Sequence, residues 1–201
     1  TRRSSDLAGR YEPGHDKNRQ RCMPDAHTIR YFRGKLPHWL VAEHSFFITF
    51  CRKGQRAIPT CRDPRRPGAT SPASWFDSFV QADRLLDSMP TPSGSLAHPA
   101  VASMLCNNFD WLRKRGWRIW TACIMPSHVH CVMRNTEGRG GSLLEDLGLF
   151  KNFTGREANR LLGLQGSFWQ REVFDRWCRN GEDWFRFFCY TVQNPVQAGA
   201  V

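Results

Sequence analysis

The chain has 201 residues, which suits one domain or one domain preceded by an arm. Hydrophobic residues make up 40% and aromatic residues 12%, so the chain is not disordered throughout, because disordered chains have too few aromatics to bury a core. Basic residues outnumber acidic ones by 29 to 18, and the net charge of +11 indicates a polyanionic partner. No apolar run approaches the ~18 residues of a membrane-spanning helix, and the first 21 residues hold no apolar signal region. We therefore expect a cytoplasmic protein without a membrane segment.

The excess of positive charge lies mainly in the first third of the chain. Residues 1–66 hold 15 basic and 6 acidic side chains, whereas residues 67–201 hold 14 and 12. Residues 1–30 are polar and Arg-rich and show no hydrophobic period, so we predict a basic flexible arm there and a single domain over residues 31–201. The basic residues of this first third that we select as candidate phosphate contacts are Arg33, Lys35, Arg52, Lys53 and Arg56. A solvated surface is the alternative, and only phosphate contacts would make binding steeply salt-dependent.

The first predicted elements are a strand and two helices. Residues 44–51 are β-branched and aromatic, as in a buried strand, and residues 54–72 combine proline, glycine and arginine, as in a loop. Apolar residues recur at helical spacing over residues 74–89, and a second helix is predicted over residues 98–115. The predicted buried face of this second helix consists of Val101, Leu105, Phe109 and Leu112.

A hairpin and a further helix are predicted next. Two β-rich runs at 117–125 and 127–134 follow one another closely, as the strands of a hairpin do. Ser142 and Glu145 have the spacing of a capping box, which predicts a helix that runs to about Leu162.

The last predicted elements are a strand and the final helix. Residues 168–175 form a candidate edge strand, and Asn180 is placed to cap a helix that runs to about Gln193, because Pro195 interrupts backbone hydrogen bonding. The complete order of elements fits an α+β, ferredoxin-like fold: an antiparallel sheet with two helices on one face. The final helix is additional and is expected to cover the other face.

Two histidines in the predicted hairpin are candidate metal ligands. Alternate side chains of a strand share a face, so His128 and His130 project together while Val129 points to the other side. Two neighbouring imidazoles form half of a divalent-metal site, although such a pair also serves purely structural roles.

The final helix carries the candidate nucleophile. Arg186, Tyr190 and Asn194 recur at intervals of four residues and form a polar stripe, opposite an expected buried side that includes Phe185 and Val192. The phenol of Tyr190 would attack a phosphodiester, a metal would neutralise the developing charge, and Asn194 would supply a third ligand. Arg186 would hold a phosphate oxygen. The alternative is a tyrosine whose ring packs on the helix surface while its hydroxyl is solvated.

Several of these segments together resemble one family. The histidine strand CIMPSHVHCVMR (123–134) and the sequence YTVQNPVQAGAV (190–201) are similar to signatures of the REP-associated tyrosine transposases, the insertion-sequence-200-like group of single-tyrosine HUH transposases. The connecting stretches RGKLPHW (33–39), FKNFTGREANRLLG (150–163) and FWQREVFDRWCRN (168–180) resemble the same family and occur in the same order.

The resemblance implies a ferredoxin-like catalytic core that cleaves and rejoins single-stranded DNA beside hairpins through a 5′-phosphotyrosine link. It implies His128 and His130 as ligands of Mg²⁺ or Mn²⁺, Asn194 as the third ligand, Tyr190 as the nucleophile and Lys151 as a DNA contact. Imidazole ligands favour Mn²⁺ over Mg²⁺, which prefers oxygen. The resemblance also implies a bacterial-type, nucleoid-associated protein that acts as a monomer or homodimer.

Some features depart from the family pattern, and two other functions stay open. Gln197 stands where a basic residue is usual, and the basic, proline-rich stretch at 54–72 is long. A non-catalytic module that binds single-stranded nucleic acid would also have a ferredoxin-like sheet and a basic chain. A structural metal-binding domain would keep the histidines without cutting DNA. Cleavage assays with EDTA as the control separate these functions.

Overall fold

The structure is a computed structural model, and it describes residues 29–33, 37–41, 44–54, 72–88, 96–135 and 142–200. Most of the predicted arm and of the predicted loop at 54–72 lie outside these residues, as do Lys35 and Arg56. No helix among the described residues is long and apolar enough to cross a membrane.

The centre of the fold is a four-stranded antiparallel sheet. Its strands are β3 (Ser45–Cys51), β4 (Trp117–Ile124), β5 (His128–Asn135) and β6 (Phe174–Trp177), in the spatial order β4-β5-β3-β6. The first and third of these strands along the chain are therefore central, as in ferredoxin-like folds. The predicted α+β class is confirmed.

One face of the sheet is covered by α2 (Pro99–Lys114) and α3 (Leu143–Leu162). The large apolar core on this face combines alternate residues of β3 and β5 with the helix residues predicted to be buried, including Val101 and Leu105. Because alternate side chains of a strand point to opposite faces, the intervening residues of both strands belong to the other side of the sheet.

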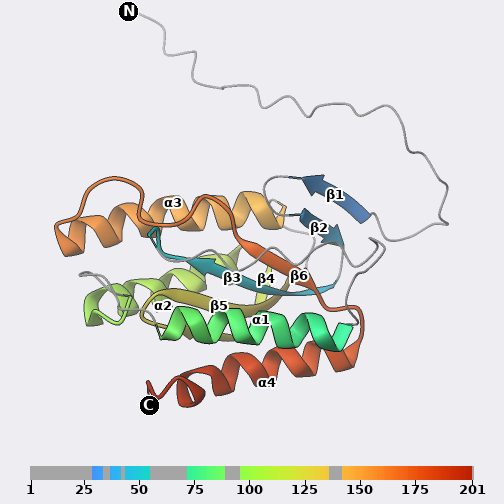
Figure 1. Ribbon diagram of the computed structural model, residues 1–201. Helices are drawn as coiled ribbons and strands as arrows, with labels where there is room; N and C mark the ends of the chain where they lie inside the picture. The colour runs from blue at the N-terminus through green and yellow to red at the C-terminus, as the bar shows by residue number, and fades with distance from the viewer. Residues whose placement is uncertain are drawn as a thin grey trace, which may run out of the picture.

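The opposite face is covered by α1 (Pro72–Asp87) and α4 (Gly181–Gln197), which lie across the sheet from α3 (Figure 1). The rings of Phe47 from β3, Phe79 from α1 and Phe187 from α4 pack together here: Phe47 stacks on Phe187 at 4.7 Å and meets Phe79 edge to face at 5.2 Å. The final helix covers this face as expected, but the sequence did not indicate that α1 lies beside it.

A small hairpin, not predicted from the sequence, precedes the sheet. It pairs β1 (Ile29–Arg33) with β2 (Pro37–Val41). His38 of this hairpin is hydrogen-bonded to Asp175 of β6, which ties the hairpin to the edge of the main sheet. Ile29 and Arg30, the last two residues of the segment predicted to be an arm, pair with Val41 and Leu40 of β2.

The helix limits follow the capping signals closely in α3. The Ser142 hydroxyl accepts from the Glu145 amide, the Glu145 carboxylate accepts from the Ser142 amide, and Gly163 ends the helix in the left-handed conformation.

Two other limits were wrong. β6 begins at Phe174, because the preceding segment instead pairs with the end of β3 through the bridge between Trp169 and Arg52. α4 continues to Gln197, because Pro195 removes only its own N–H, while the Asn194 carbonyl still accepts from a later amide.

Candidate active site

The two histidines of β5 lie side by side on the sheet face that α1 and α4 cover. His128 pairs with Cys51 and His130 with Thr49 in the register of β3 and β5, and both imidazoles are fully buried. The prediction that His128 and His130 share one face is correct. Val129 belongs to the core on the other side of the sheet, as the alternation of a strand requires.

Hydroxyl groups fix the orientation of both rings. The Ser127 Oγ lies 2.9 Å from the Nδ1 of His128, and the Thr49 Oγ1 lies 2.8 Å from the Nδ1 of His130. With each Nδ1 engaged, both Nε2 atoms face the same point and are 2.9 Å apart. Hydrogen bonds of this kind to the second ring nitrogen are what orients histidines that bind metals.

The third member of the cluster is Asp83, which comes from α1. One of its carboxylate oxygens is 2.9 Å from the Nε2 of His130, and the other is 3.5 Å from the Nε2 of His128. Burial alone would raise the pKa of Asp83, but the charge and hydrogen bond of His130, together with His128 and Tyr190, outweigh it and lower this pKa to about 2. The site therefore holds a buried, ionised carboxylate.

Sequence reasoning did not select Asp83, although a signal was present. Phe79, Ala82 and Leu86 form the buried stripe of α1, and Asp83 falls within that stripe. A carboxylate among apolar helix positions is almost never fully buried unless it is paired. Such a position indicates a partner elsewhere in the fold, and here the partners are the two histidines.

Tyr190 connects α4 to this cluster. Its hydroxyl donates a hydrogen bond to the Asp83 carboxylate, and its ring meets Phe76 and Phe79 of α1 edge to face, each at 5.6 Å. Only 6% of Tyr190 is exposed. Burial, followed by the negative charge of Asp83, raises the pKa of the phenol, so the hydroxyl keeps its proton in this arrangement.

The orientation of α4 differs from the sequence prediction. Phe185 and Val192, expected on the buried side, are 62% and 51% exposed, whereas Tyr190 and Asn194 face the sheet. Tyr190 and Asn194 face inward because both form hydrogen bonds to Asp83 of α1, and a paired polar group carries little penalty for burial.

Asn194 lies directly beside the tyrosine. Its amide nitrogen donates to the Asp83 carboxylate at 3.1 Å and to the Tyr190 oxygen at 3.2 Å. Its amide oxygen is buried and forms no hydrogen bond within the part of the chain that the structure describes. The residue predicted as a third metal ligand therefore adjoins the histidine cluster, and a metal–oxygen bond from it stays a prediction.

The donor atoms of Asp83, His128 and His130 fit a divalent cation. All three ligand atoms lie within 4.8 Å of one another. Two ligands that bind one ion at about 2.1 Å and at right angles to each other lie about 3 Å apart, close to the separations found here. The second Asp83 oxygen is buried and has no hydrogen-bond partner among the described residues, so it can serve as a ligand atom. Two imidazoles and a carboxylate suit Mn²⁺ and related ions better than Mg²⁺.

A second carboxylate borders the cluster. The Asp87 carboxylate, one helical turn after Asp83, lies 4.0 Å from the Nε2 of His128. Burial and the charge of Asp83 raise its pKa to about 6. Burial, with the neighbouring His130, lowers the pKa of His128 to about 3, so its imidazole is neutral at pH 7, the form that binds a metal.

The cluster is closed to solvent by α1. Asp83 and both histidines are fully buried, and α1 contributes Phe76 and Phe79 to the wall around Tyr190. A polymeric substrate cannot reach the hydroxyl of Tyr190 in this arrangement.

The described members of the set of basic residues predicted to contact DNA lie at separate places in the fold, and Arg186 is the member nearest to Tyr190 in the chain. Arg186 lies on α4, bonds Glu182 at 3.2 Å and covers the ring of Phe76. Lys151 lies on α3, across the sheet, where its ammonium donates to the carbonyl of Arg171 at 3.0 Å. Arg33 is the last residue of β1, and Arg52 and Lys53 follow directly after β3.

Comparison with known proteins supports the fold. The sequence matches no protein-family model and no curated protein. The structure is similar to that of a REP-associated tyrosine transposase bound to a REP hairpin, with a TM-score of 0.50 and 18% sequence identity over 82% of this chain and 73% of that one. At this identity the likeness establishes a shared α+β fold.

Proposed function

We propose that the protein is a metal-dependent transposase or endonuclease that cleaves and rejoins single-stranded DNA through a 5′-phosphotyrosine intermediate. The observation that carries this proposal is the Asp83 carboxylate, which contacts His130 and accepts the hydrogen bond of the Tyr190 hydroxyl. A nucleophile and a cation site that share one carboxylate are adjacent enough to act on a single phosphodiester.

The chemistry assigned to the chain is an in-line displacement. The Tyr190 oxygen forms a bond to phosphorus, the bond from phosphorus to the 3′-oxygen breaks, and the 3′-oxygen leaves as a hydroxyl after taking a proton from water. The phenolic proton has the Asp83 carboxylate as its immediate acceptor. In the reverse step a free 3′-hydroxyl displaces the tyrosine, so the joining reaction needs no ATP.

The remaining groups bind and orient. Asp83, His128 and His130 would hold a divalent cation, proposed to be Mg²⁺ or Mn²⁺, with Asn194 as a further ligand. When bound, that ion supplies positive charge to a phosphate oxygen. Ser127 and Thr49 keep the two imidazoles turned toward the ion.

Substrate access requires α1 to move away from α4. The ring of Tyr190 packs against Phe76 and Phe79 of α1, and its buried hydroxyl is bonded to Asp83 of the same helix, so a phosphodiester would reach the hydroxyl only when these contacts open. The described arrangement is then a resting form of the enzyme, in which the nucleophile is held by Asp83.

The substrate assignment rests on charge and on likeness. A net charge of +11 suits a polyanion. The similar solved structure is bound to a REP hairpin, which supports a hairpin with a single-stranded flank as the substrate. A nucleoid-associated, cytoplasmic location and action as a monomer or homodimer belong to the same proposal.

The test is to trap the covalent intermediate. Single-stranded hairpins from the flanks of the gene are incubated with the full chain and Mn²⁺, and adducts are resolved on a denaturing gel. We expect an adduct that disappears in Tyr190→Phe and persists in Tyr31→Phe, a matched control at one of the two other tyrosines. An adduct that persists in Tyr190→Phe, or the lack of any adduct with the complete hairpin panel, overturns the proposal.

A non-catalytic nucleic-acid-binding module is the second candidate, and the closed site favours it. Binding alone does not need Tyr190 to be reached, and the hydroxyl is buried under α1. This function predicts hairpin binding that EDTA leaves unchanged and no covalent adduct at any Mn²⁺ concentration.

A further inference from the structure

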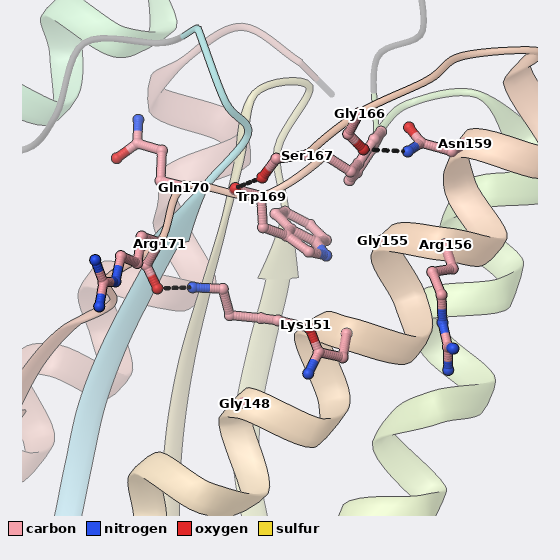
Figure 2. A pocket seen from close by; sticks show the side chains of 12 residues that line it. Gly148, Lys151, Gly155, Arg156, Asn159, Gly166, Ser167, Trp169, Gln170 and Arg171 are labelled. Carbon is pink, nitrogen blue, oxygen red and sulfur yellow. Dashed lines mark hydrogen bonds between the residues drawn. The ribbon is translucent and has the colours of Figure 1, made fainter. Parts of the chain in front are cut away.

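A basic cavity of about 590 Å³ lies between α3 and the segment over residues 166–171 (Figure 2). α3 covers the sheet face opposite to Tyr190. Its size is within the range of small-ligand sites. Lys151, Arg156 and Arg171 are its three cations, and none of the described residues that line it is acidic. The walls therefore favour an anion.

Lys151 is built into the wall of this cavity. The residue is only 8% exposed, and its ammonium donates to the backbone carbonyls of Arg171 and Glu172, at 3.0 and 3.4 Å. Figure 2 shows its side chain reaching from α3 across to the carbonyl of Arg171. An ammonium has three donors, so these two bonds leave one for an anion in the cavity. Burial lowers the pKa of Lys151 to about 8, and a bound anion would offset that cost.

Two glycines of α3 line the cavity, and only one is explained by packing. A Cβ on Gly155 would lie 3.1 Å from the Trp169 ring, so the close approach of this indole requires glycine. A Cβ on Gly148 would meet nothing within 4 Å. Glycine destabilises a helix interior relative to alanine, so Gly148 leaves helix backbone open to the cavity without any gain in packing.

A second cavity of about 550 Å³ adjoins the first between α2 and α3, and the two share Asn152 and Arg156. Aromatic side chains line this second cavity: Trp111 is half-buried, and Phe153 is half exposed. None of the described residues around it is acidic. Cations that follow a phosphate backbone, next to aromatic rings on which bases stack, are the usual combination in sites for single-stranded nucleic acid.

The first cavity connects to the same end of the sheet as the candidate active site. The backbone N–H of Gln170 donates to the carbonyl of Cys51 at the end of β3. The backbone N–H of Arg52 donates to the carbonyl of Ser127, the residue before His128. The cavity and the candidate active site therefore both lie near the end of β3.

We propose that these two adjoining cavities bind an unpaired stretch of the nucleic-acid strand, with phosphates on Lys151, Arg156 and Arg171 and a base on Phe153. This inference deepens the proposed function and rests on it for the identity of the strand. The strand would then pass around the end of β3 toward Tyr190.

The experiment measures binding without chemistry. The full chain carrying Tyr190→Phe is titrated into a short fluorescein-labelled single-stranded oligonucleotide, and anisotropy is followed at several salt concentrations. We expect Arg156→Gln to weaken binding at least about threefold and to lower the salt slope by about 0.7, the value for one phosphate contact on a single strand. We expect Phe153→Ala to weaken binding about fivefold or more without changing the salt slope.

Matched controls separate the cavities from general surface effects. Arg160 lies one turn after Arg156 on α3, pairs with Glu157 at 3.0 Å and does not line the cavity, so Arg160→Gln should change the affinity by less than about twofold. Phe185→Ala, an exposed position on α4, should behave in the same way. Gly148→Ala should keep or raise the melting temperature and yet weaken binding, which excludes misfolding as the cause.

The outcomes distinguish this inference from the proposed function. If Arg156→Gln, Phe153→Ala and Gly148→Ala all bind within about twofold of their parent, or if a blunt duplex binds as tightly as the single strand, the cavities do not hold an unpaired strand. If these variants bind weakly as expected but the chain with Tyr190 intact never forms an adduct, the proposed function fails and the binding site stands. If the adduct forms but the variants bind as their parent does, the proposed function stands and the binding site fails.

Discussion

The hydroxyl of Tyr190 donates its hydrogen bond to the carboxylate of Asp83, a residue 107 positions earlier in the chain. The same carboxylate faces His128 and His130, so α1, β5 and α4 meet at a single group. Any substitution of Asp83 therefore acts on the proposed nucleophile and on the candidate cation site together.

Asp83→Asn should weaken Mn²⁺ binding at least about tenfold and abolish formation of the covalent adduct, because an amide is a poorer metal ligand and removes the negative charge from between the histidines. Isothermal titration calorimetry with Mn²⁺ measures the first effect. Asp77→Asn, at an exposed position of the same helix, is the matched control and should bind Mn²⁺ like the natural chain. Equal Mn²⁺ affinity in the two variants would show that Asp83 is not a ligand of the ion.

Thr49→Val should lower the Mn²⁺ affinity about tenfold, although Thr49 touches no metal in the proposed site. Its hydroxyl is bonded to the Nδ1 of His130, and partners of this kind typically contribute 10- to 100-fold to metal affinity, roughly. Thr191→Val removes another buried hydroxyl, which bonds the carbonyl of Phe187 in its own helix, and controls for the loss of a buried hydrogen bond. Similar Mn²⁺ affinities in the two variants would show that Thr49 does not position His130.

Phe76→Ala should accelerate formation of the covalent adduct by a few-fold, because it removes an aromatic contact through which α1 covers Tyr190. Phe76 is half-buried, so we expect a smaller loss of stability than the ~3–5 kcal/mol of a fully buried phenylalanine. Leu85→Ala changes an exposed residue of the same helix and should leave the rate unchanged. A rate that falls in Phe76→Ala would show that α1 supports the reacting arrangement instead of covering it.

Local sequence patterns predicted the parts of the site that depend on a single element. The two-residue period of a strand placed His128 and His130 on one face, and the capping box at Ser142 fixed the start of α3. Both follow from geometry within a few residues.

The contribution of α1 was not predictable in the same way. Whether α1 packs on one sheet face or the other depends on long-range packing, and the Asp83 contacts exist only once that face is chosen. The orientation of α4 was mispredicted for a related reason: hydrophobicity alone placed Phe185 inside, whereas the polar partners of Tyr190 and Asn194 come from distant elements. The sequence therefore indicated the histidines of the candidate site, but neither the contribution of α1 nor the orientation of α4.

Because Lys151 is buried, we expect the free energy of unfolding to depend on pH. Burial lowers its pKa in the folded chain to about 8, against 10.5 for an ordinary lysine, so the unfolded chain binds more protons between these two values. Between pH 8 and 10.5, the free energy of unfolding of the natural chain should therefore rise relative to that of the Lys151→Met variant. The rise is at most about 3 kcal/mol, because one pKa unit corresponds to ~1.4 kcal/mol. Urea unfolding at pH 7.5 and 9.5 measures the difference, and Lys114→Met, an exposed lysine of α2, should show no such rise.

The two glycines of α3 should respond in opposite directions to the same substitution. Gly148→Ala places a methyl group in open space and gains helix propensity, so we expect stabilisation by roughly 0.5–1 kcal/mol. Gly155→Ala gains the same propensity but brings a Cβ to 3.1 Å from the Trp169 ring, whose indole N–H is tied to Thr154 at 3.0 Å. The ring cannot withdraw without losing that bond, so we expect a net loss of roughly 1–2 kcal/mol. Thermal unfolding of both variants measures the contrast, and a Gly155→Ala chain as stable as Gly148→Ala would mean that the contact between Trp169 and α3 is looser than described.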